Sequence, residues 1–257
     1  MLTSLHNPLI KEIRKLRQGK VSELALLEGT NLIEAACLAN CPLETVCYSQ
    51  NWQQKNPELW LSLSQLAQRL ELVDLDLLSS LATTVNPDGV IATIRKSQLV
   101  RTVPANLQLG LVLENIQDPG NLGTIMRTAL ACEVDCLFLS KNCARFDQPK
   151  VLRSSVGACF QLACQSCEDL VTTVKFYQAQ GLQVVATTPG AQKLYWELDL
   201  RQPTLLLLGN EAAGLSQELI QIADQSVRLP LSPAVESLNV AITSAILLYE
   251  RQRQQNS

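Results

Sequence analysis

The chain has 257 residues, of which 47% are hydrophobic, so it can bury the core of one large domain or of two ordinary ones. Its formal net charge of −3 argues against a nucleic-acid binder that is basic over its whole surface, although a local basic patch is still possible. We find no secretion signal at the start of the sequence and no apolar run of the roughly 18 residues that a membrane span needs. We therefore expect a soluble cytoplasmic protein without a membrane partner.

Nine cysteines without a secretion signal favour free thiols over a disulfide framework. Cys164 and Cys167 form a single Cys-x-x-Cys motif, but a zinc site needs further ligands, and His6 is the only histidine. We therefore expect most of the thiols to be small buried hydrophobic side chains, and we predict no metal site.

The first predicted helix, residues 7–18, is the most basic stretch of the chain. Its apolar face is formed by Leu9, Ile10, Ile13 and Leu16. Its other side carries Lys11, Arg14, Lys15 and Arg17. This side is either a solvated helix surface or a contact for phosphates, and in the second case Lys11, Arg14 and Arg17 are the candidate nucleic-acid-binding residues.

Short alternating elements follow, and they predict a small α/β domain over residues 1–94. The expected strands are 24–27, 45–48, 70–73 and 89–94. The expected helices are 29–39, 59–69 and 75–81. Residues 95–106 are predicted to be a linker, because they are charged, contain Pro104 and lose the apolar periodicity.

Residues 107–257 predict a second α/β domain, in which a mostly parallel sheet is covered by helices on both faces. The expected strands are 107–113, 134–139, 182–187, 204–208 and 227–229. The expected helices are 122–131, 168–180, 216–223 and 238–251. Between them, residues 148–158 have the pattern of a loop that enters a helix.

The stretch 114–131 joins a buried strand to the first helix of this second domain. Asp118 can cap the helix, and Pro119 suits its first turn. Asn121 and Arg127 lie off the apolar face, beside the carboxyl end of the strand, where open α/β sheets bind ligands. Taken alone, this pattern is more typical of an ordinary strand–helix turn with a solvated arginine.

Residues 204–216 pass from an apolar strand into a loop that contains two glycines. Gly209 and Gly214 have the spacing of a P-loop, but Leu215 stands in place of its lysine and Glu211 adds a negative charge. This argues against phosphate binding. The chain also lacks a Gly-x-Gly-x-x-Gly motif, which argues against a dehydrogenase and against a Rossmann-type methyltransferase.

Residues 229–243 form a third stretch of interest. A strand ends at Leu229, a turn with two prolines follows, and Glu236 with Ser237 can cap the last helix. By itself this pattern predicts no more than a capped helix.

Together, the three stretches resemble the three motifs of the SpoU (TrmH) family of RNA ribose 2′-O-methyltransferases, part of the SPOUT class. Residues 118–129, Asp-Pro-Gly-Asn-Leu-Gly-x-x-x-Arg-Thr-Ala, are similar to motif one. Residues 208–215, Leu-Gly-Asn-Glu-Ala-Ala-Gly-Leu, are similar to motif two, and residues 230–240 to motif three. Residues 7–34 resemble the substrate-binding domain that precedes the catalytic domain in many members, so the resemblance covers nearly the whole chain.

The resemblance implies a fold, a cofactor and an assembly. The fold would be a C-terminal SPOUT-type parallel sheet with a trefoil knot, preceded by a small α/β substrate-binding domain. The cofactor would be S-adenosylmethionine, and the assembly a homodimer with the active sites at its interface. The cofactor-binding residues would be Gly209, Asn210, Leu229, Pro230 and Leu238. Pro233 stands where relatives often have glycine, and Ala241 where many have serine.

The resemblance gives Arg127 the central catalytic role. Because a guanidinium stays protonated, we expect it to act electrostatically, on an RNA phosphate or on the developing alkoxide. The other polar motif positions are Asn121, Glu211, Ser237 and Asn239, which we expect to orient the ribose hydroxyl, the arginine and the cofactor. The group that takes the proton stays open, with Glu211 as a candidate.

Two functions of different classes follow. The first is an RNA ribose 2′-O-methyltransferase, acting on ribosomal RNA in preference to transfer RNA by analogy with relatives that carry an added N-terminal domain. The second is a catalytically silent RNA-binding or assembly protein on the same scaffold. The presence of Arg127, Glu211 and Asn239 favours the enzyme.

Overall fold

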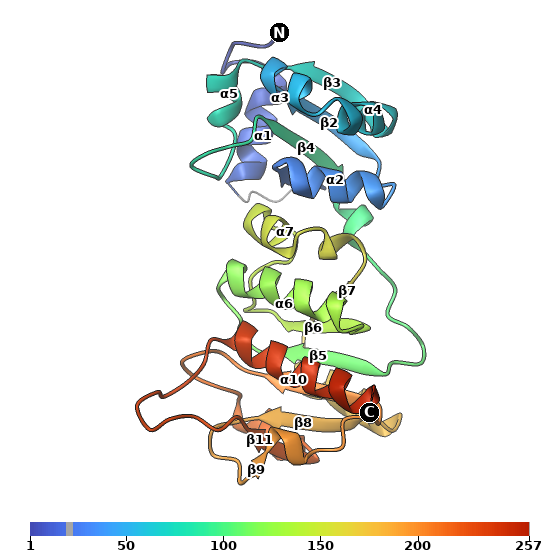
Figure 1. Ribbon diagram of the computed structural model, residues 1–257, viewed down its shortest axis with the longest axis vertical. Helices are drawn as coiled ribbons and strands as arrows, with labels where there is room; N and C mark the ends of the chain where they lie inside the picture. The colour runs from blue at the N-terminus through green and yellow to red at the C-terminus, as the bar shows by residue number, and fades with distance from the viewer. Residues whose placement is uncertain (19–22, 257) are drawn as a thin grey trace. The chain divides into compact units, whose positions relative to one another are not determined.

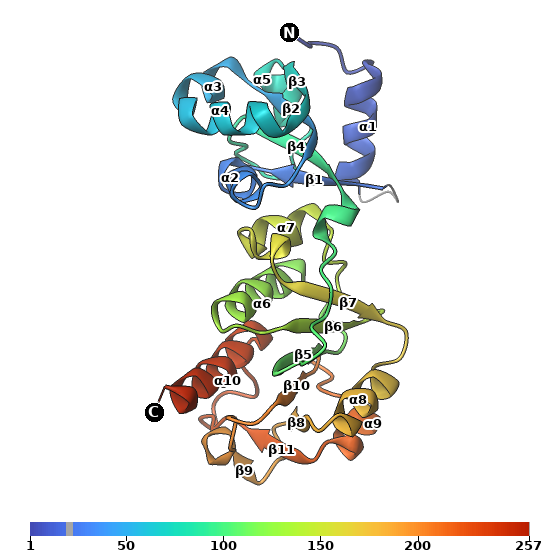
Figure 2. The same cartoon turned by 90° about the vertical axis from the view of Figure 1, so that its right-hand side faces the viewer.

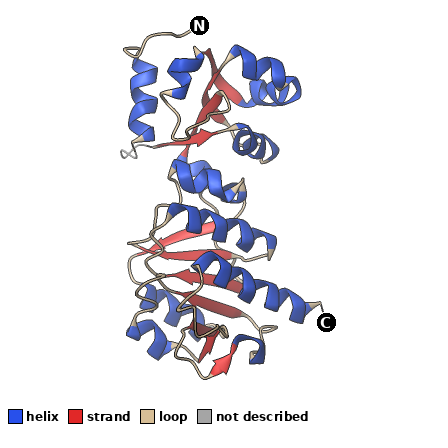
Figure 3. Cartoon of the chain, turned by 60° about the vertical axis from the view of Figure 1, so that its left-hand side comes forward, coloured by secondary structure: helices blue, strands red, loops and turns tan. Residues whose placement is uncertain are grey.

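The computed structural model describes residues 1–18 and 23–256. It divides into two compact units, each with its own sheet (Figures 1 and 3). The first unit contains Met1–Val100 and Phe146–Gln161, and the second contains Arg101–Arg145 and Leu162–Ser257. The short stretch 146–161 thus joins the first unit, although it follows a strand of the second unit in the chain.

The first unit is built on a four-stranded sheet of order β1-β4-β2-β3. Its strands are β1 (Leu24–Glu28), β2 (Leu43–Tyr48), β3 (Ala67–Leu72) and β4 (Val90–Arg95). Strand β4 runs antiparallel to β1 and β2, while β2 and β3 are parallel. The helices are α1 (Pro8–Arg17), α2 (Thr30–Leu38), α3 (Gln50–Lys55), α4 (Pro57–Leu66), α5 (Leu75–Ser79) and, from the later stretch, α7 (Pro149–Ser155).

Helix α1 confirms the expected apolar face. Asn7 caps it by accepting a hydrogen bond from the Leu9 backbone N–H at 2.9 Å. The four predicted inward residues are buried in a core with Leu26 and Ile91. The basic side chains lie on the exposed side, which is the arrangement that an amphipathic helix requires.

The second unit confirms the predicted parallel α/β sheet. Its seven strands have the order β7-β6-β5-β10-β8-β11-β9, and every neighbouring pair is parallel. The strands are β5 (Leu109–Leu113), β6 (Cys136–Ser140), β7 (Ala163–Cys167), β8 (Gln183–Thr187), β9 (Lys193–Leu194), β10 (Thr204–Leu208) and β11 (Gln225–Arg228).

Helices cover both faces of this sheet, as predicted (Figure 2). Helices α6 (Pro119–Ala131) and α10 (Val240–Gln255) pack together on one face. Helices α8 (Leu170–Ala179) and α9 (Gln217–Ile222) pack together on the other. Three short 3₁₀ helices complete the described elements: η1 (Lys96–Leu99), η2 (Ala158–Phe160) and η3 (Tyr195–Glu197).

The predicted cap of the last helix is wrong. Helix α10 begins at Val240, and Asn239 caps it by accepting hydrogen bonds from the N–H groups of Ala241 (2.9 Å) and Ile242 (3.4 Å). The short amide of Asn239 reaches these groups from the position directly before the helix. Glu236 and Ser237 lie earlier, in the exposed loop that joins β11 to α10.

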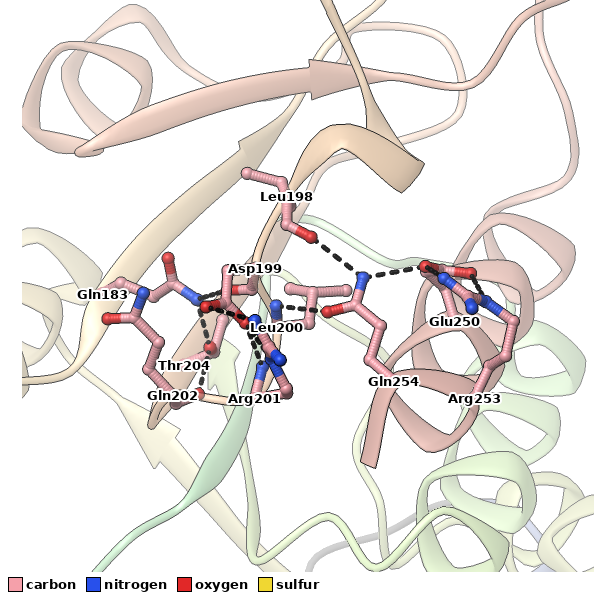
Figure 4. A network of polar contacts seen from close by, with 10 residues as sticks. All are labelled: Gln183, Leu198, Asp199, Leu200, Arg201, Gln202, Thr204, Glu250, Arg253 and Gln254. Atoms are coloured by element: carbon pink, nitrogen blue, oxygen red, sulfur yellow. Dashed lines mark hydrogen bonds and ion pairs between the residues drawn. The ribbon is translucent and has the colours of Figure 1, made fainter. Parts of the chain in front are cut away.

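The other end of α10 is tied to the loop before β10 (Figure 4). The Gln254 amide donates to the Leu198 carbonyl at 2.9 Å and accepts from the Leu200 N–H at 2.8 Å. Gln254 and Arg253 also both donate to the Glu250 carboxylate, and the hydrogen bond from Arg253 holds the pKa of Glu250 below its usual value. These contacts attach the C-terminal end of α10 to the segment before β10. Across the described ranges, no helix combines the length and apolar character needed to cross a bilayer.

Candidate functional site

The three motif loops leave the sheet from neighbouring strands. Strand β10 lies between β5 and β8, and β8 pairs with β11. Because all these strands are parallel, their carboxyl ends lie at one edge of the sheet, where open α/β sheets bind ligands. The loops that follow β5, β10 and β11, which hold motifs one, two and three, therefore emerge at the same edge (Figure 1).

One polar residue from each motif joins a hydrogen-bonded chain. Asn121, in the first turn of α6, donates through Nδ2 to Glu211 Oε1 in the loop after β10. Its Oδ1 accepts from Nδ2 of Asn239, the cap of α10, at 2.9 Å. Three of the five predicted catalytic residues, Asn121, Glu211 and Asn239, are thus in direct contact. Glu211 Oε2 accepts no hydrogen bond from the described residues, so this second carboxylate oxygen can accept from a ligand.

Arg127 lies on the exposed side of α6. Six helical positions separate it from Asn121, which places the two side chains about 120° apart around the helix axis. Within the described part of the chain, no acidic side chain pairs with its guanidinium. The structure does not bring Arg127 into contact with the hydrogen-bonded residues Glu211, Asn121 and Asn239. Its guanidinium is exposed on the helix that carries Asn121, so it is available to an anionic ligand.

The loop after β10 is shaped by its own side chains. Asn210 donates through Nδ2 to the Asn115 carbonyl at 2.9 Å, and its Oδ1 accepts from the N–H groups of Ala212 (2.9 Å) and Ala213 (3.0 Å). A Cβ on Gly209 would lie 2.2 Å from the carbonyl carbon of Gly214, so only glycine fits there. The polar atoms of the Asn210 side chain are therefore all hydrogen-bonded to backbone groups, and a ligand would contact mainly the backbone of the loop.

The residues at this edge fit S-adenosylmethionine. Thr187 ends β8, between the loops that follow β10 and β11, and its buried hydroxyl has no partner among the described residues. A hydroxyl of this kind costs about 1–3 kcal/mol unless a ligand atom satisfies it. Leu229 and Leu238 are half-buried in the loops and Pro230 is exposed, which gives apolar surface for a ring. S-adenosylmethionine is a nucleoside with a charged sulfur, and a site for it needs polar contacts for its hydrogen-bonding groups and apolar side chains beside its ring.

The remaining predicted residues lie apart from this polar chain. Ser237 is exposed in the loop between β11 and α10, and no hydrogen bond to its hydroxyl occurs in the described ranges. Lys11 and Arg14 are exposed on α1 of the first unit. Arg17 is exposed as well, and its Nη1 donates to the Ser80 carbonyl at 2.7 Å.

Sequence reasoning missed residues that support the loops. Glu114 Oε2 accepts from the Ser216 N–H at 2.7 Å and so fixes the end of the loop after β10. Asn115 has a positive φ of 58°, which asparagine tolerates better than most residues, and its N–H donates to Ser140 Oγ at 2.9 Å. Glu114 and Asn115 stand directly after the buried strand β5, and this position could have marked them as candidates. The sequence does not show which groups they contact.

The Cys-x-x-Cys motif lies in β7, an edge strand. Residues three apart in a strand point to opposite faces of the sheet, so Cys164 and Cys167 do not converge on one ligand. Burial is the main cause that raises the pKa of Cys167, and it raises the pKa of Cys136 in the neighbouring strand to about 12. Thiols of this kind act as buried hydrophobic groups.

Comparison with known proteins gives consistent similarities. Residues 108–249 match the model of the SpoU rRNA Methylase family, and residues 7–92 match the MRM3-like substrate binding domain. The chain is 43% identical, over 99% of its length and 94% of the relative, to a protein of Synechocystis sp. named as an uncharacterized tRNA/rRNA methyltransferase.

Two solved structures are similar over the whole chain. One is described as an RNA 2′-O ribose methyltransferase, with a TM-score of 0.84 and 32% identity over 100% of this chain and 99% of that one. The other is an AdoMet-bound rRNA methyltransferase from Sinorhizobium meliloti, with a TM-score of 0.84 and 30% identity over 100% of this chain and 98% of that one.

Proposed function

The chain belongs to the SpoU rRNA methylase family, and we propose that it transfers a methyl group from S-adenosylmethionine to a ribose 2′-hydroxyl of ribosomal RNA. The observation that supports this most strongly is the chain of hydrogen bonds from Glu211 through Asn121 to Asn239, which joins one polar residue from each motif. Arg127, exposed on the helix that carries Asn121, supplies the cation that an RNA backbone needs.

The proposed cofactor site uses the loops at the carboxyl edge of the sheet. S-adenosylmethionine, when bound, supplies a methyl group on a positively charged sulfur. The loop backbone at Gly209 and Asn210 would bind its polar groups, and the Thr187 hydroxyl would gain its missing hydrogen bond. Leu229, Pro230 and Leu238 would pack on its apolar surface, and Ser237 would help to orient it.

The proposed chemistry depends on positioning, because an in-line methyl transfer needs the hydroxyl oxygen aligned with the methyl group. Arg127 would hold the phosphate next to the target ribose and stabilise negative charge as it develops on the 2′-oxygen. Glu211, fixed by Asn121, has an oxygen left to accept the hydroxyl proton, directly or through water. Asn239 would keep Asn121 in place.

A homodimer is the assembly that we propose. The outer side of α10 carries Ile242 (51% exposed), Ala245, Ile246 and Tyr249 (59% exposed), at the spacing of one helical face. A second copy packed on this face would remove it from water. We also propose the SPOUT-type knot in the second unit and an RNA-binding role for residues 1–94 beside the catalytic role of residues 107–257, both of which the family resemblance implies.

The sequence itself supports three further proposals. Residues 95–106 link the two domains, Lys11, Arg14 and Arg17 on the basic side of the first helix contact RNA, and the protein is cytoplasmic.

Transfer of a labelled methyl group to total RNA, afterwards separated into ribosomal and transfer fractions, tests the proposal. We expect label in the ribosomal fraction, at a nucleotide whose 3′ bond resists alkaline cleavage because its 2′-hydroxyl is blocked. Label in transfer RNA alone would contradict the proposed substrate. Failure both to transfer label and to bind S-adenosylmethionine would instead support the silent RNA-binding protein.

A further inference from the structure

Glu114 lies outside the three motifs, but it holds the loop that carries motif two. It is the first residue after β5, and its backbone N–H donates to the Leu208 carbonyl of β10 at 2.9 Å. Its Oε2 accepts from the N–H of Ser216 at 2.7 Å, directly after the last residue of motif two. A hydrogen bond from a backbone N–H to a carboxylate is charge-assisted and stronger than a neutral one. The far end of the loop is therefore attached to the residue that follows β5.

The near end of the same loop is attached to the next residue, Asn115. The Asn115 carbonyl accepts from Asn210 Nδ2 at 2.9 Å. The Asn115 N–H donates at 2.9 Å to Oγ of Ser140, the last residue of β6. Both contacts use the backbone of Asn115, so they do not depend on the side chain of Glu114. The loop thus has an attachment at each end, and the far one depends on the Glu114 carboxylate.

Between these two attachments, the loop is folded on itself. The N–H groups of the two alanines after Glu211 donate to Asn210 Oδ1, and the Gly214 N–H donates to the Asn210 carbonyl at 2.8 Å. Residues 210–214 therefore form one compact unit that includes Glu211. The contact of the Glu211 carboxylate with Asn121 in α6 then depends on how this unit is held at its two ends.

We propose that Glu114 is a positioning residue for Glu211, because it fixes the far end of the loop and so sets the contact of Glu211 with Asn121. Without the Glu114 carboxylate, the unit can turn about its near attachment. A displacement of about 1 Å can cost about a hundredfold in rate. The proposed cofactor contacts at Gly209 and Asn210 lie beside the attachment that remains, so cofactor binding should change less. The inference rests on the proposed methyl transfer.

Steady-state methyl transfer to ribosomal RNA by the full chain tests the inference. Glu114→Ala should lower kcat about tenfold to a hundredfold, while the KM for S-adenosylmethionine changes less than about threefold. Glu114→Gln keeps an oxygen that can accept from the Ser216 N–H, so it should restore most of the lost kcat. A wild-type kcat in Glu114→Ala, or an equal loss in both variants, would overturn the inference.

Asp135→Ala is the matched control for a loss of stability alone. Asp135 Oδ2 accepts from the N–H groups of Gln108 (2.6 Å) and Leu109 (2.9 Å), which is the same kind of contact at the amino-terminal edge of the same sheet. This variant should lower the melting temperature and keep a kcat close to the wild-type value below the melting transition. A loss of kcat as large as that in Glu114→Ala would contradict the positioning role.

The donor side of the hydrogen bond provides a second pair of variants. Ser216→Pro removes the N–H, and the φ of Ser216, −62°, suits proline. Ser216→Ala is its control, because it removes the hydroxyl that caps α9 and keeps the N–H. We expect Ser216→Pro to lower kcat as Glu114→Ala does, and the double variant to be no slower than either, since both remove one bond. Losses that multiply in the double variant would contradict the inference.

Hydrogen exchange of the loop needs no methyl transfer, so it separates this inference from the proposed function. In Glu114→Ala, the amides of residues 211–214 should exchange about tenfold faster than in the wild-type protein, and in Glu114→Gln at nearly the wild-type rate. If the wild-type protein transfers no methyl group, the proposed function fails, and the exchange rates still test the attachment. Unchanged exchange in Glu114→Ala would overturn the inference.

Discussion

Asn121 is the residue that connects the proposed catalytic groups. Its planar amide offers a donor and an acceptor together, and it uses the donor on Glu211 and the acceptor on Asn239. Both of its polar groups are therefore occupied, and we expect it to position its neighbours rather than to touch the reacting atoms. Because the motifs lie far apart in the chain, only the fold brings these three side chains together.

Replacing Asn121 with alanine should lower kcat about a hundredfold, because Glu211 and the cap of α10 lose their shared partner. The KM for S-adenosylmethionine and the melting temperature should change little, since the sheet and the loop after β10 remain intact. Thr124→Ala is the matched control, because among the described residues this hydroxyl bonds only to the Gly120 carbonyl of its own helix. A wild-type kcat in Asn121→Ala would contradict the positioning role.

The buried thiols give a prediction about pH. Burial is the main cause that raises the pKa of Cys47 and Cys136 from 9.0 to about 12 in the folded protein. As the pH rises from about 9 towards 12, the unfolded chain loses these protons first, so stability should fall across this range.

At pH 8, alkylation followed by mass spectrometry should leave both thiols unmodified until denaturant is added, while the half-buried Cys164 reacts earlier. Rapid native alkylation of Cys47 and Cys136 would contradict their burial.

At the scale of elements, the loop after β10 is a preformed unit. Gly209 and Asn210 begin it, Gly214 closes it with a backbone bridge to Asn210, and Glu114 fixes the N–H of Ser216 at its end. The loop therefore presents its backbone in one conformation, which lowers the cost of binding a cofactor.

Gly209→Ala should abolish cofactor binding, because the new Cβ would lie 2.2 Å from the backbone of Gly214 and force the loop open. Isothermal titration with S-adenosylmethionine measures the effect. Gly181→Ala is the control, since it adds strain at φ +96° but meets nothing within 4 Å and precedes the opposite end of β8. Retained binding in Gly209→Ala, or equal loss in both variants, would argue against a preformed cofactor loop.

Elements with strong apolar periodicity were predictable from the sequence, and weakly patterned ones were not. The strands β5 and β10 are fully buried, and they appear as continuous apolar runs. The edge strand β7 carries the exposed residues Gln165 and Ser166, so its sequence gives no strand signal. The predicted helix 59–69 in fact ends at Leu66, and α3 precedes it. The cap of α10 was misplaced because two capping residues, Ser237 and Asn239, lie close together.

At the scale of the whole molecule, the alternation of strands and helices predicted the parallel sheet, since parallel strands need crossover helices. It could not predict that residues 146–161 join the first unit. That assignment depends on contacts between residues far apart in the chain, such as the ion pair of Arg153 with Glu28. In the same way, the sequence does not show that the Thr187 hydroxyl is buried without a partner, because this property appears only after the strands pack.

The proposed dimer is tested by Ile242→Glu, which places a charge at the N-terminal end of the exposed apolar face of α10. We expect sedimentation to show a dimer for the wild-type protein and a monomer for the variant, because burying an unpaired charge outweighs the apolar contact. Phe176→Glu, at a similarly exposed position on α8, is the control and should remain dimeric. A dimer that persists in Ile242→Glu would exclude this face as the interface.

The most direct test of the proposed ribose methylation is the formation of 2′-O-methylated nucleosides in ribosomal RNA by the wild-type chain and by Arg127→Ala. Mass spectrometry of the digested RNA identifies the product. With the wild-type protein we expect one 2′-O-methylated nucleoside to accumulate. With Arg127→Ala it should fall by at least about a hundredfold, while cofactor binding and the melting temperature stay unchanged, because Arg127 is exposed and unpaired among the described residues. Equal product from both proteins would contradict the role of Arg127, and methylation on a base instead of the ribose would contradict the proposed reaction.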